Sequence, residues 1–310
     1  MGNFKFGVSL RETGSRDEWI AKCRRAEELG YDVITVPDHL GTGRFAPFPV
    51  LAMAAAVTER VRLGPLVSNV PFYNLALFAR EASTTAALLD GRLDLGLGAG
   101  HMKAEFDAAG LPWQPASERI GYLEESLGYL RKHFEDEGLP MPRLLIAGNS
   151  DGVLGLAAEH ADVVGFAGLR QQPGKPPGTF KLDNAEAVDE RVAYFRARAG
   201  AREVEYNMLV QLVEITDDRE QAAAHWHELT ERSTVADARE LLDAPQLLLG
   251  TVEEIAGQLV ARRERYGFSY ITVFEPALEA FAPVIRELQR STEAPPRAGG
   301  FATRTPKSRQ

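Results

Sequence analysis

The sequence predicts an α/β fold, a (β/α)8 TIM barrel, from two features of its pattern. Strand-like and helix-like segments alternate along the 310 residues, and the alternation continues for eight units. The strand-like segments are short and almost continuously apolar, as is typical of parallel strands buried on both faces. A doubly wound sheet with a helical extension is the alternative. The barrel is preferred because the alternation does not stop after five or six units.

Apolar runs, caps and stops place the elements along the chain. The predicted strands span residues 4–10, 32–36, 61–68, 92–100, 143–148, 162–168, 204–216 and 269–274. The predicted helices span residues 15–30, 48–60, 74–90, 117–136, 151–161, 185–200, 252–267 and 278–291; a further helical segment precedes "LPWQP", and 217–243 is expected to be helical with irregular joints. In the first helix, Ser15 is a predicted N-cap, Glu18 follows three residues later and Gly30 is a stop.

The barrel domain is predicted to extend over residues 1–291, with insertion segments inside it. After the sixth strand, the stretch "LRQQPGKPPGTFKLDN" is rich in Pro, Gly and Gln, which indicates a long exposed loop. The final residues, 292–310, are basic and rich in Pro and Gly, so we expect a disordered tail.

Composition excludes several classes of function. The net charge of -9 argues against a nucleic-acid partner. No apolar run is long enough to cross a bilayer, and the start "MGNFKFGVSL" lacks the pattern of a secretory signal, so we expect a cytoplasmic protein without a membrane partner. Because Cys23 is the single cysteine, no internal disulfide and no thiolate metal cluster can form, and we predict no metal site.

The stretch "VPDHLG" places an acid and a histidine directly after the second predicted strand. In a barrel of this type, function lies at the C-terminal ends of the strands, where Asp38 and His39 would be. An imidazole can give or take a proton near neutral pH, and a carboxylate can hold its tautomer. The alternative is that Asp38 caps a turn and His39 only packs; the two residues by themselves favour neither interpretation.

The fourth predicted strand ends in alternating glycines, "LGLGAGHMKAEF". Gly96, Gly98 and Gly100 remove side chains where the chain leaves the barrel, which would let a flat ligand approach the backbone. A tight turn from strand to helix is the alternative. His101 and Glu105 follow one helical turn apart, either facing the pocket or forming a surface pair.

Two other strand ends point to a ligand. After the fifth strand, Gly148, Asn149 and Ser150 precede a helix, whose free N–H groups could bind a phosphate; an ordinary N-cap is the alternative. After the third strand, Pro65 and Asn69 interrupt a clean ending, which indicates either a bulge behind a planar ring or an irregular loop.

Four stretches in this order resemble the bacterial-luciferase-like superfamily, especially its coenzyme F420-dependent oxidoreductases. They are "AEELGYDVITVPDHL", "PVLAMAAAVTERVRLGPLVSNVPFYNLALFAREASTTAALLDGRLDLGLGAG", "ERIGYLEESLGYLR" and "LLIAGNSDGVLGLAAEHADVVGF". The resemblance runs from about Phe4 to Leu288. It implies a (β/α)8 barrel with an insertion, a deazaflavin or flavin at the C-terminal ends of the strands, and a homodimer.

The resemblance also implies roles for individual residues. Asp38 and His39 would lie beside the cofactor ring, with His39 as the acid or base. A non-prolyl cis peptide is expected at Leu66–Val67, and Asn69 would touch the ring edge. The remaining expected cofactor contacts are Gly98, Ala99, Gly100 and His101 at the pocket wall and Gly148, Asn149 and Ser150 at the phosphate. His101 stands where many relatives have tryptophan, so the wall is expected to be more polar here.

The function that the resemblance implies is hydride transfer between coenzyme F420 and a small organic substrate. Such a protein binds the ring, holds the substrate beside it and supplies a proton. A monooxygenase that uses reduced FMN and molecular oxygen is the alternative, and a barrel that binds a flavin without turnover is a third possibility. Substrate specificity is expected in the 171–184 loop and the 217–243 segment, and the sequence names no substrate.

Overall fold

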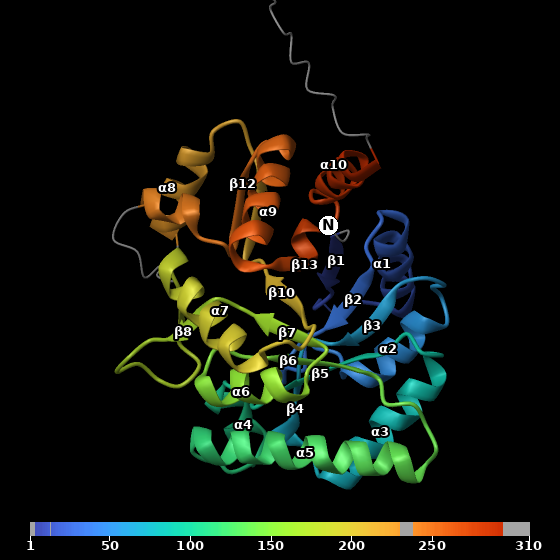
Figure 1. Cartoon of the computed structure of the whole chain (residues 1–310). Coiled ribbons are helices and arrows are strands. Elements are labelled where there is room, and N and C mark those ends of the chain that lie inside the picture. Colours follow the sequence, from blue (N-terminus) through green and yellow to red (C-terminus); the bar gives the residue numbers. More distant parts are fainter. Residues whose placement is uncertain (1–3, 13, 230–237, 294–310) are drawn as a thin grey trace, which may run out of the picture.

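The strands of the computed structural model, which describes residues 4–12, 14–229 and 238–293, form a parallel barrel surrounded by helices (Figure 1). The strands follow the order β3-β2-β1-β13-β10-β7-β6-β5-β4. The third barrel strand is interrupted: β3 pairs with β2, and β4 pairs with β5. A parallel bridge between Leu63 and Leu93 also joins β3 to the segment before β5, so the barrel closes as predicted.

The barrel strands are β1 (Lys5–Ser9), β2 (Val33–Val36), β3 (Arg62–Pro65) with β4 (Ser68–Asn69), β5 (Asp94–Gly98), β6 (Arg143–Ala147), β7 (Val163–Phe166), β10 (Glu205–Leu209) and β13 (Phe268–Phe274). The helices are α1 (Arg16–Glu28), α2 (Pro47–Ala55), α3 (Leu75–Leu88), α4 (Lys103–Ala109), α5 (Ala116–Asp136), α6 (Asp151–His160), α7 (Ala185–Ala199), α8 (Arg219–Leu229), α9 (Val252–Tyr266) and α10 (Ala282–Glu293). Short 3-10 helices are η1 (Val70–Phe72), η2 (Ala238–Asp243) and η3 (Glu275–Ala277).

The local signals for the first helix are confirmed. The Ser15 hydroxyl accepts a hydrogen bond from the Glu18 N–H at 3.3 Å, and the Glu18 carboxylate accepts one from the Ser15 N–H at 2.6 Å. Cys23 is buried on the inner face of α1, as expected for a small apolar side chain. None of the helices within the described ranges is both long and apolar enough to span a membrane.

The prediction for the seventh strand, 204–216, is wrong in its second half. The first half is β10, whereas β11 (Leu212–Ile215) leaves the barrel and pairs with β12 (Leu247–Gly250), a strand that was not predicted. The run "VEYNMLVQLVEIT" is continuous in its apolar pattern, so the pattern cannot show that its two halves have different partners. Of the segment predicted to be helical, α8 and η2 are observed, and residues 230–237 lie outside the described ranges.

The Pro/Gly-rich segment after β7 is partly ordered rather than all loop. Strands β8 (Leu169–Gln171) and β9 (Phe180–Leu182) form an antiparallel hairpin, and the Pro/Gly stretch is the connection between them (Figure 1). The expected disorder of residues 292–310 falls almost entirely outside the described ranges.

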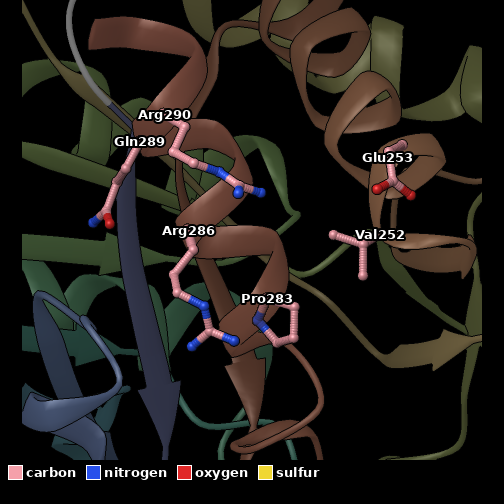
Figure 2. A pocket seen from close by; sticks show the side chains of 6 residues that line it. All are labelled: Val252, Glu253, Pro283, Arg286, Gln289 and Arg290. Atoms are coloured by element: carbon pink, nitrogen blue, oxygen red, sulfur yellow. The ribbon is translucent and has the colours of Figure 1, made fainter.

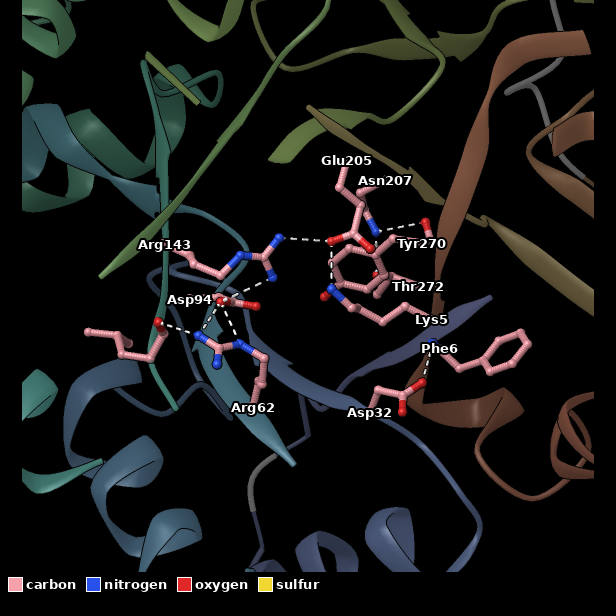
Figure 3. Close-up of polar contacts among 11 residues, drawn as sticks. Lys5, Phe6, Asp32, Arg62, Asp94, Arg143, Glu205, Asn207, Tyr270 and Thr272 are labelled. Carbon is pink, nitrogen blue, oxygen red and sulfur yellow. Dashed lines mark hydrogen bonds and ion pairs between the residues drawn. The ribbon is translucent and has the colours of Figure 1, made fainter. Parts of the chain in front are cut away.

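A ring of charged side chains closes the N-terminal end of the barrel (Figure 3). Each comes from the first residue of a strand. Glu205 pairs with Lys5 at 2.6 Å and with Arg143 at 3.0 Å. Asp94, only 3% exposed, pairs with Arg62 at 2.7 Å and lies 3.8 Å from Arg143. Each of these charges has an oppositely charged partner, so ion pairs join five strands at the end of the barrel opposite to the one where function is expected.

Asp94→Asn should lower the free energy of unfolding by about 2–3 kcal/mol, because two arginines then lose a buried carboxylate. The decrease stays below that for a fully buried ion pair, since both arginines are partly exposed. Urea unfolding measures this. Asp136→Asn is the control: Asp136 pairs with Lys132 at 2.8 Å on the exposed face of α5, and its loss should cost about 0.5 kcal/mol or less. Equal effects of the two substitutions would show that the ring does not stabilise the barrel.

Candidate active site

The predicted site residues do come together at the C-terminal end of the barrel. Asp38 and His39 follow β2, Asn69 ends β4, and His101 follows β5. They lie at the end opposite to the charge ring, because all barrel strands run parallel. This placement allows side chains from several loops to face one ligand.

His39 is held by Glu105, a residue of α4. The Nδ1 atom of His39 lies 2.9 Å from Oε1 of Glu105, and the Leu40 N–H also hydrogen-bonds to this carboxylate. An ionised carboxylate only accepts hydrogen bonds, so the imidazole carries its proton on Nδ1 and keeps the lone pair of Nε2 free. The carboxylate that orients the histidine is therefore Glu105, and not the neighbouring Asp38.

The surroundings favour a neutral imidazole at His39. Burial lowers its pKa, and the positive charges of Arg44 and Arg11 lower it further. Burial raises the pKa of the Glu105 carboxyl, an effect opposed by the Leu40 N–H and by Arg44. A neutral His39 with a free Nε2 can accept a proton from a ligand hydroxyl, and its protonated form can return it.

His101 lies beside His39 under the β8–β9 hairpin. The two imidazoles meet edge to face with centroids 5.5 Å apart, and Phe180 of β9 packs against the other side of His101 at 5.3 Å. His101 keeps an exposed ring, yet the protein atoms packed around its inner edge, followed by His39 and Arg119, lower its pKa to about 4. The hairpin from the predicted loop thus contacts the site directly.

Asp38 organises the wall of the site. Its Oδ2 accepts hydrogen bonds from the Asn69 N–H and the Tyr73 hydroxyl, both at 2.9 Å, and its side chain is 8% exposed. Burial raises the pKa of this carboxyl, while the two hydrogen bonds act in the opposite direction. Asp38 therefore positions Asn69. Sequence reasoning missed Tyr73, since it considered only a bulge or an irregular loop at this strand end and gave no role to the tyrosine.

The cis peptide expected at Leu66–Val67 is confirmed. It lies between β3 and β4, where the third strand breaks. The glycines of β5 make room for this segment: a Cβ at Gly96 would lie 2.0 Å from the Pro65 carbonyl oxygen, and one at Gly98 would lie 2.5 Å from the Val67 side chain. The alternating glycines thus accommodate the neighbouring strand.

Two polar atoms near the break have no hydrogen-bond partner among the described residues. Among the described residues, Asn69 Oδ1 and Ser68 Oγ are buried and have no hydrogen-bond partner. A Cβ at Gly100 would lie 2.5 Å from Asn69 Oδ1, and Gly100 has a positive φ of 72°. Both the steric contact and the left-handed backbone conformation therefore disfavour a side chain at this position. Since buried polar atoms are normally paired, Asn69 fits the edge of a heteroaromatic ring that donates a hydrogen bond.

The predicted phosphate site has fewer available hydrogen-bond donors than expected. The Gly148 N–H donates to the Gly165 carbonyl at 3.2 Å, and the Asn149 side chain donates to Asp183 at 2.9 Å, so both groups are engaged within the protein. Ser150 is the N-cap of α6, and its hydroxyl accepts from the Val153 N–H at 3.4 Å. What remains for an anion is the set of first-turn N–H groups of α6.

The side chain of Asp151 does not oppose an anion at this helix end. Asp151 begins α6, and its carboxylate pairs with Arg191 of α7 at 2.5 Å. That ion pair neutralises the one acidic group in the first turn. The start of α6 therefore keeps its electropositive character.

Two sequence relatives share a segment of the chain. It is 39% identical over 139 residues to an F420-dependent glucose-6-phosphate dehydrogenase of Intrasporangium calvum, covering 42% of this chain and 41% of that protein. It is 36% identical over 141 residues to the enzyme of the same name from Kribbella flavida, covering 43% and 42%. The similarity thus spans less than half the length of these relatives.

Solved structures match over nearly the whole chain at low identity. An F420-dependent secondary alcohol dehydrogenase in complex with an F420-acetone adduct has a TM-score of 0.70 at 15% identity, covering 93% of this chain and 99% of that one. A long-chain alkane monooxygenase has a TM-score of 0.70 at 14% identity, covering 94% and 92%. These likenesses show a shared barrel fold.

The family assignment rests on a longer match than either sequence relative offers. The model of the family described as "Luciferase-like monooxygenase" matches residues 3–228, which is most of the chain. This range includes β1 to β11 and every residue placed in the site above. The chain therefore belongs to the luciferase-like monooxygenase family.

Proposed function

We propose that the protein is an oxidoreductase that transfers a hydride between coenzyme F420 and a small organic substrate. The observation that carries this proposal is the His39–Glu105 pair, at 2.9 Å, beside the break in the third strand. The two sequence relatives named above, both F420-dependent dehydrogenases, support it. The cofactor supplies the hydride chemistry, and the protein supplies a binding site, orientation and a proton.

The residues of the chain fit this cofactor. The ring would lie against Leu66 and Val67, with the unpaired Asn69 Oδ1 at its edge, and Asp38 would hold Asn69 in place. Gly98, Ala99, Gly100 and His101 would line the neighbouring wall, with Gly98 and Gly100 acting mainly by making space. The first turn of α6, at Ser150, would bind the phosphate through backbone N–H groups.

His39 would move the proton that accompanies hydride transfer. With Nδ1–H directed at Glu105, the Nε2 lone pair accepts the proton of a substrate hydroxyl during oxidation. Glu105 then stabilises the positive imidazolium that results, because its carboxylate lies in direct contact. In the opposite direction, the same imidazolium returns the proton to the oxygen of a carbonyl.

A monooxygenase that uses reduced FMN and oxygen is the second candidate, favoured by the description of the family itself. A barrel that binds a flavin without turnover is the third.

The expectation of a cytoplasmic homodimer also stays a prediction. Leu77 and Leu88 of α3 are exposed apolar side chains that a second copy could cover, and light scattering of the purified protein tests this.

Cofactor titration separates the candidates. We expect F420 to bind at least about tenfold more tightly than FMN, a difference that corresponds to about 1.4 kcal/mol. The measurement is ring fluorescence during titration of the purified protein with each cofactor. Tighter binding of FMN would favour the monooxygenase, and tight F420 binding without turnover of any alcohol or carbonyl substrate would favour the binding protein.

Substitutions at the histidine and its partner should lower turnover without removing the cofactor. His39→Asn cannot shuttle a proton, so kcat should fall about 10²–10⁴-fold while F420 affinity changes far less. Glu105→Gln keeps an acceptor for Nδ1 but loses the charge that stabilises the imidazolium, and a smaller fall is expected. Steady-state kinetics and melting curves are measured together. Normal turnover of folded His39→Asn would refute the role of His39.

The contribution of His101 to stability should fall on acidification below pH 6.5. The pKa of His101 is lowered to about 4 in the folded protein, so between these values the unfolded chain binds more protons and is favoured as pH drops. His39 acts in the same direction. Melting temperatures at pH 7, 5.5 and 4.5 should fall less steeply for His101→Gln than for the wild type.

A further inference from the structure

Two arginines lie together on the His39 side of the barrel mouth. Arg11 follows β1, and Arg44 lies in the loop between β2 and α2. The Arg44 guanidinium donates from Nη1 to the Arg11 carbonyl oxygen at 2.9 Å. Both arginines, together with Trp19 and Phe45, line a crevice of about 10 Å³. That volume holds about one water molecule, so a larger ligand does not fit inside this crevice.

The charge of Arg44 is not neutralised by a carboxylate within the described ranges of the chain. It donates a hydrogen bond to a backbone oxygen, and it forms no ion pair with any residue in those ranges. The nearby carboxylate of Glu275 is used elsewhere: it pairs with Lys22 and accepts the N–H groups of Arg11 and Glu12 at 2.7 and 2.9 Å. The influence of Arg44 on both His39 and Glu105 agrees with its place beside the pair.

The position of the arginines separates them from the proposed phosphate site. Around the barrel, β1 and β6 lie on opposite sides, with three strands between them in either direction when β3 and β4 are taken as one. The first turn of α6 follows β6, whereas Arg11 follows β1. One phosphate cannot contact both places, so the arginines face a different ligand group on the His39 side.

We propose that Arg44, together with Arg11, forms a subsite for an anionic group of the substrate, a phosphate or a carboxylate, next to the oxygen that exchanges its proton with His39. The proposal rests on the proposed function, because it places a substrate at His39. A guanidinium offers several N–H donors in a plane and binds such oxyanions in a forked geometry. The phenyl ring of Phe274 supports the Arg11 guanidinium, whose central carbon lies 4.7 Å from the ring centroid.

A rival site for anions exists on the outer wall of the barrel. A pocket of about 490 Å³ lies between α9 and α10. Figure 2 shows Arg286 and Arg290 on one side of it and Glu253 on the other. Arg290 pairs with Glu287, and Glu253 adds a negative charge, so this pocket is the weaker candidate. Arg286 nevertheless provides a matched control, since it is an exposed arginine far along the chain from the site.

The test is isothermal titration calorimetry of the protein with inorganic phosphate and, separately, with malonate, at constant ionic strength. Wild type should bind at least one of them with a Kd on the order of 1 mM. Arg44→Gln should weaken that binding by at least about tenfold, since a charge-assisted hydrogen bond is lost. Arg44→Lys, which keeps the charge and a donor for the Arg11 carbonyl, should weaken it less. Arg286→Gln should bind as the wild type does. The tighter of the two probes identifies the anionic group.

Three results would overturn the proposal: absence of binding to the wild type, equal binding to folded Arg44→Gln, or loss of binding in Arg286→Gln alone. F420 affinity, measured by ring fluorescence, adds a further condition. If Arg44→Gln weakened F420 as strongly as it weakened the anion, Arg44 would belong to the cofactor site and the proposal would fail. Wild type that binds the anion but not F420 would refute the proposed function and leave the anion site standing, so the two failures are distinguishable.

Discussion

The close approach of β5 to the broken third strand is the constraint on which the site depends. Gly96 and Gly98 let the Pro65 carbonyl and the Val67 side chain occupy space that a Cβ would need. Before the break the third strand pairs with β2, and after the break it pairs with β5. The break also places Asn69 in the wall of the site, where its N–H donates a hydrogen bond to Asp38. A larger side chain at either glycine would push the segment away and move Asn69 with it.

The charged side chains at the two ends of the barrel are arranged differently. At the N-terminal end, Lys5, Arg62 and Arg143 meet Asp94 and Glu205, so the charges satisfy one another. At the C-terminal end, His39 is neutral in a setting that includes Arg44, and Glu105 holds its tautomer. One end therefore pairs its charges within the protein, while the other gathers a histidine, a carboxylate and an arginine around the proposed site.

The fold alone does not choose between hydride transfer and oxygenation, because barrels of this architecture carry both kinds of chemistry. The choice depends on residues around the ring. A histidine with a carboxylate partner and a free Nε2 suits proton transfer to a substrate oxygen, and an arginine pair beside it suits a substrate with an anionic group. The β8–β9 hairpin adds a contact of its own, because Phe180 packs on His101.

The sequence by itself determined the features that depend on local chemistry. The alternation of apolar strands and helices identified the barrel, the spacing of Ser15 and Glu18 placed the start of α1, and the stretch "VPDHLG" placed His39 at a strand end. The resemblance to a family placed the cis bond at Leu66–Val67. These features are encoded within a few residues or in a repeated pattern, so they can be identified before the chain is folded.

Only the tertiary structure decided which distant residues meet. Glu105, 66 residues from His39, became its partner because closure of the barrel brings the ends of β2 and β5 to the same rim. In the same way, β11 left the barrel to pair with β12, and the Gly148 N–H was taken by Gly165. The physical reason is that hydrogen-bonding groups pair with whatever the closed barrel places opposite them, and local sequence does not specify that neighbour.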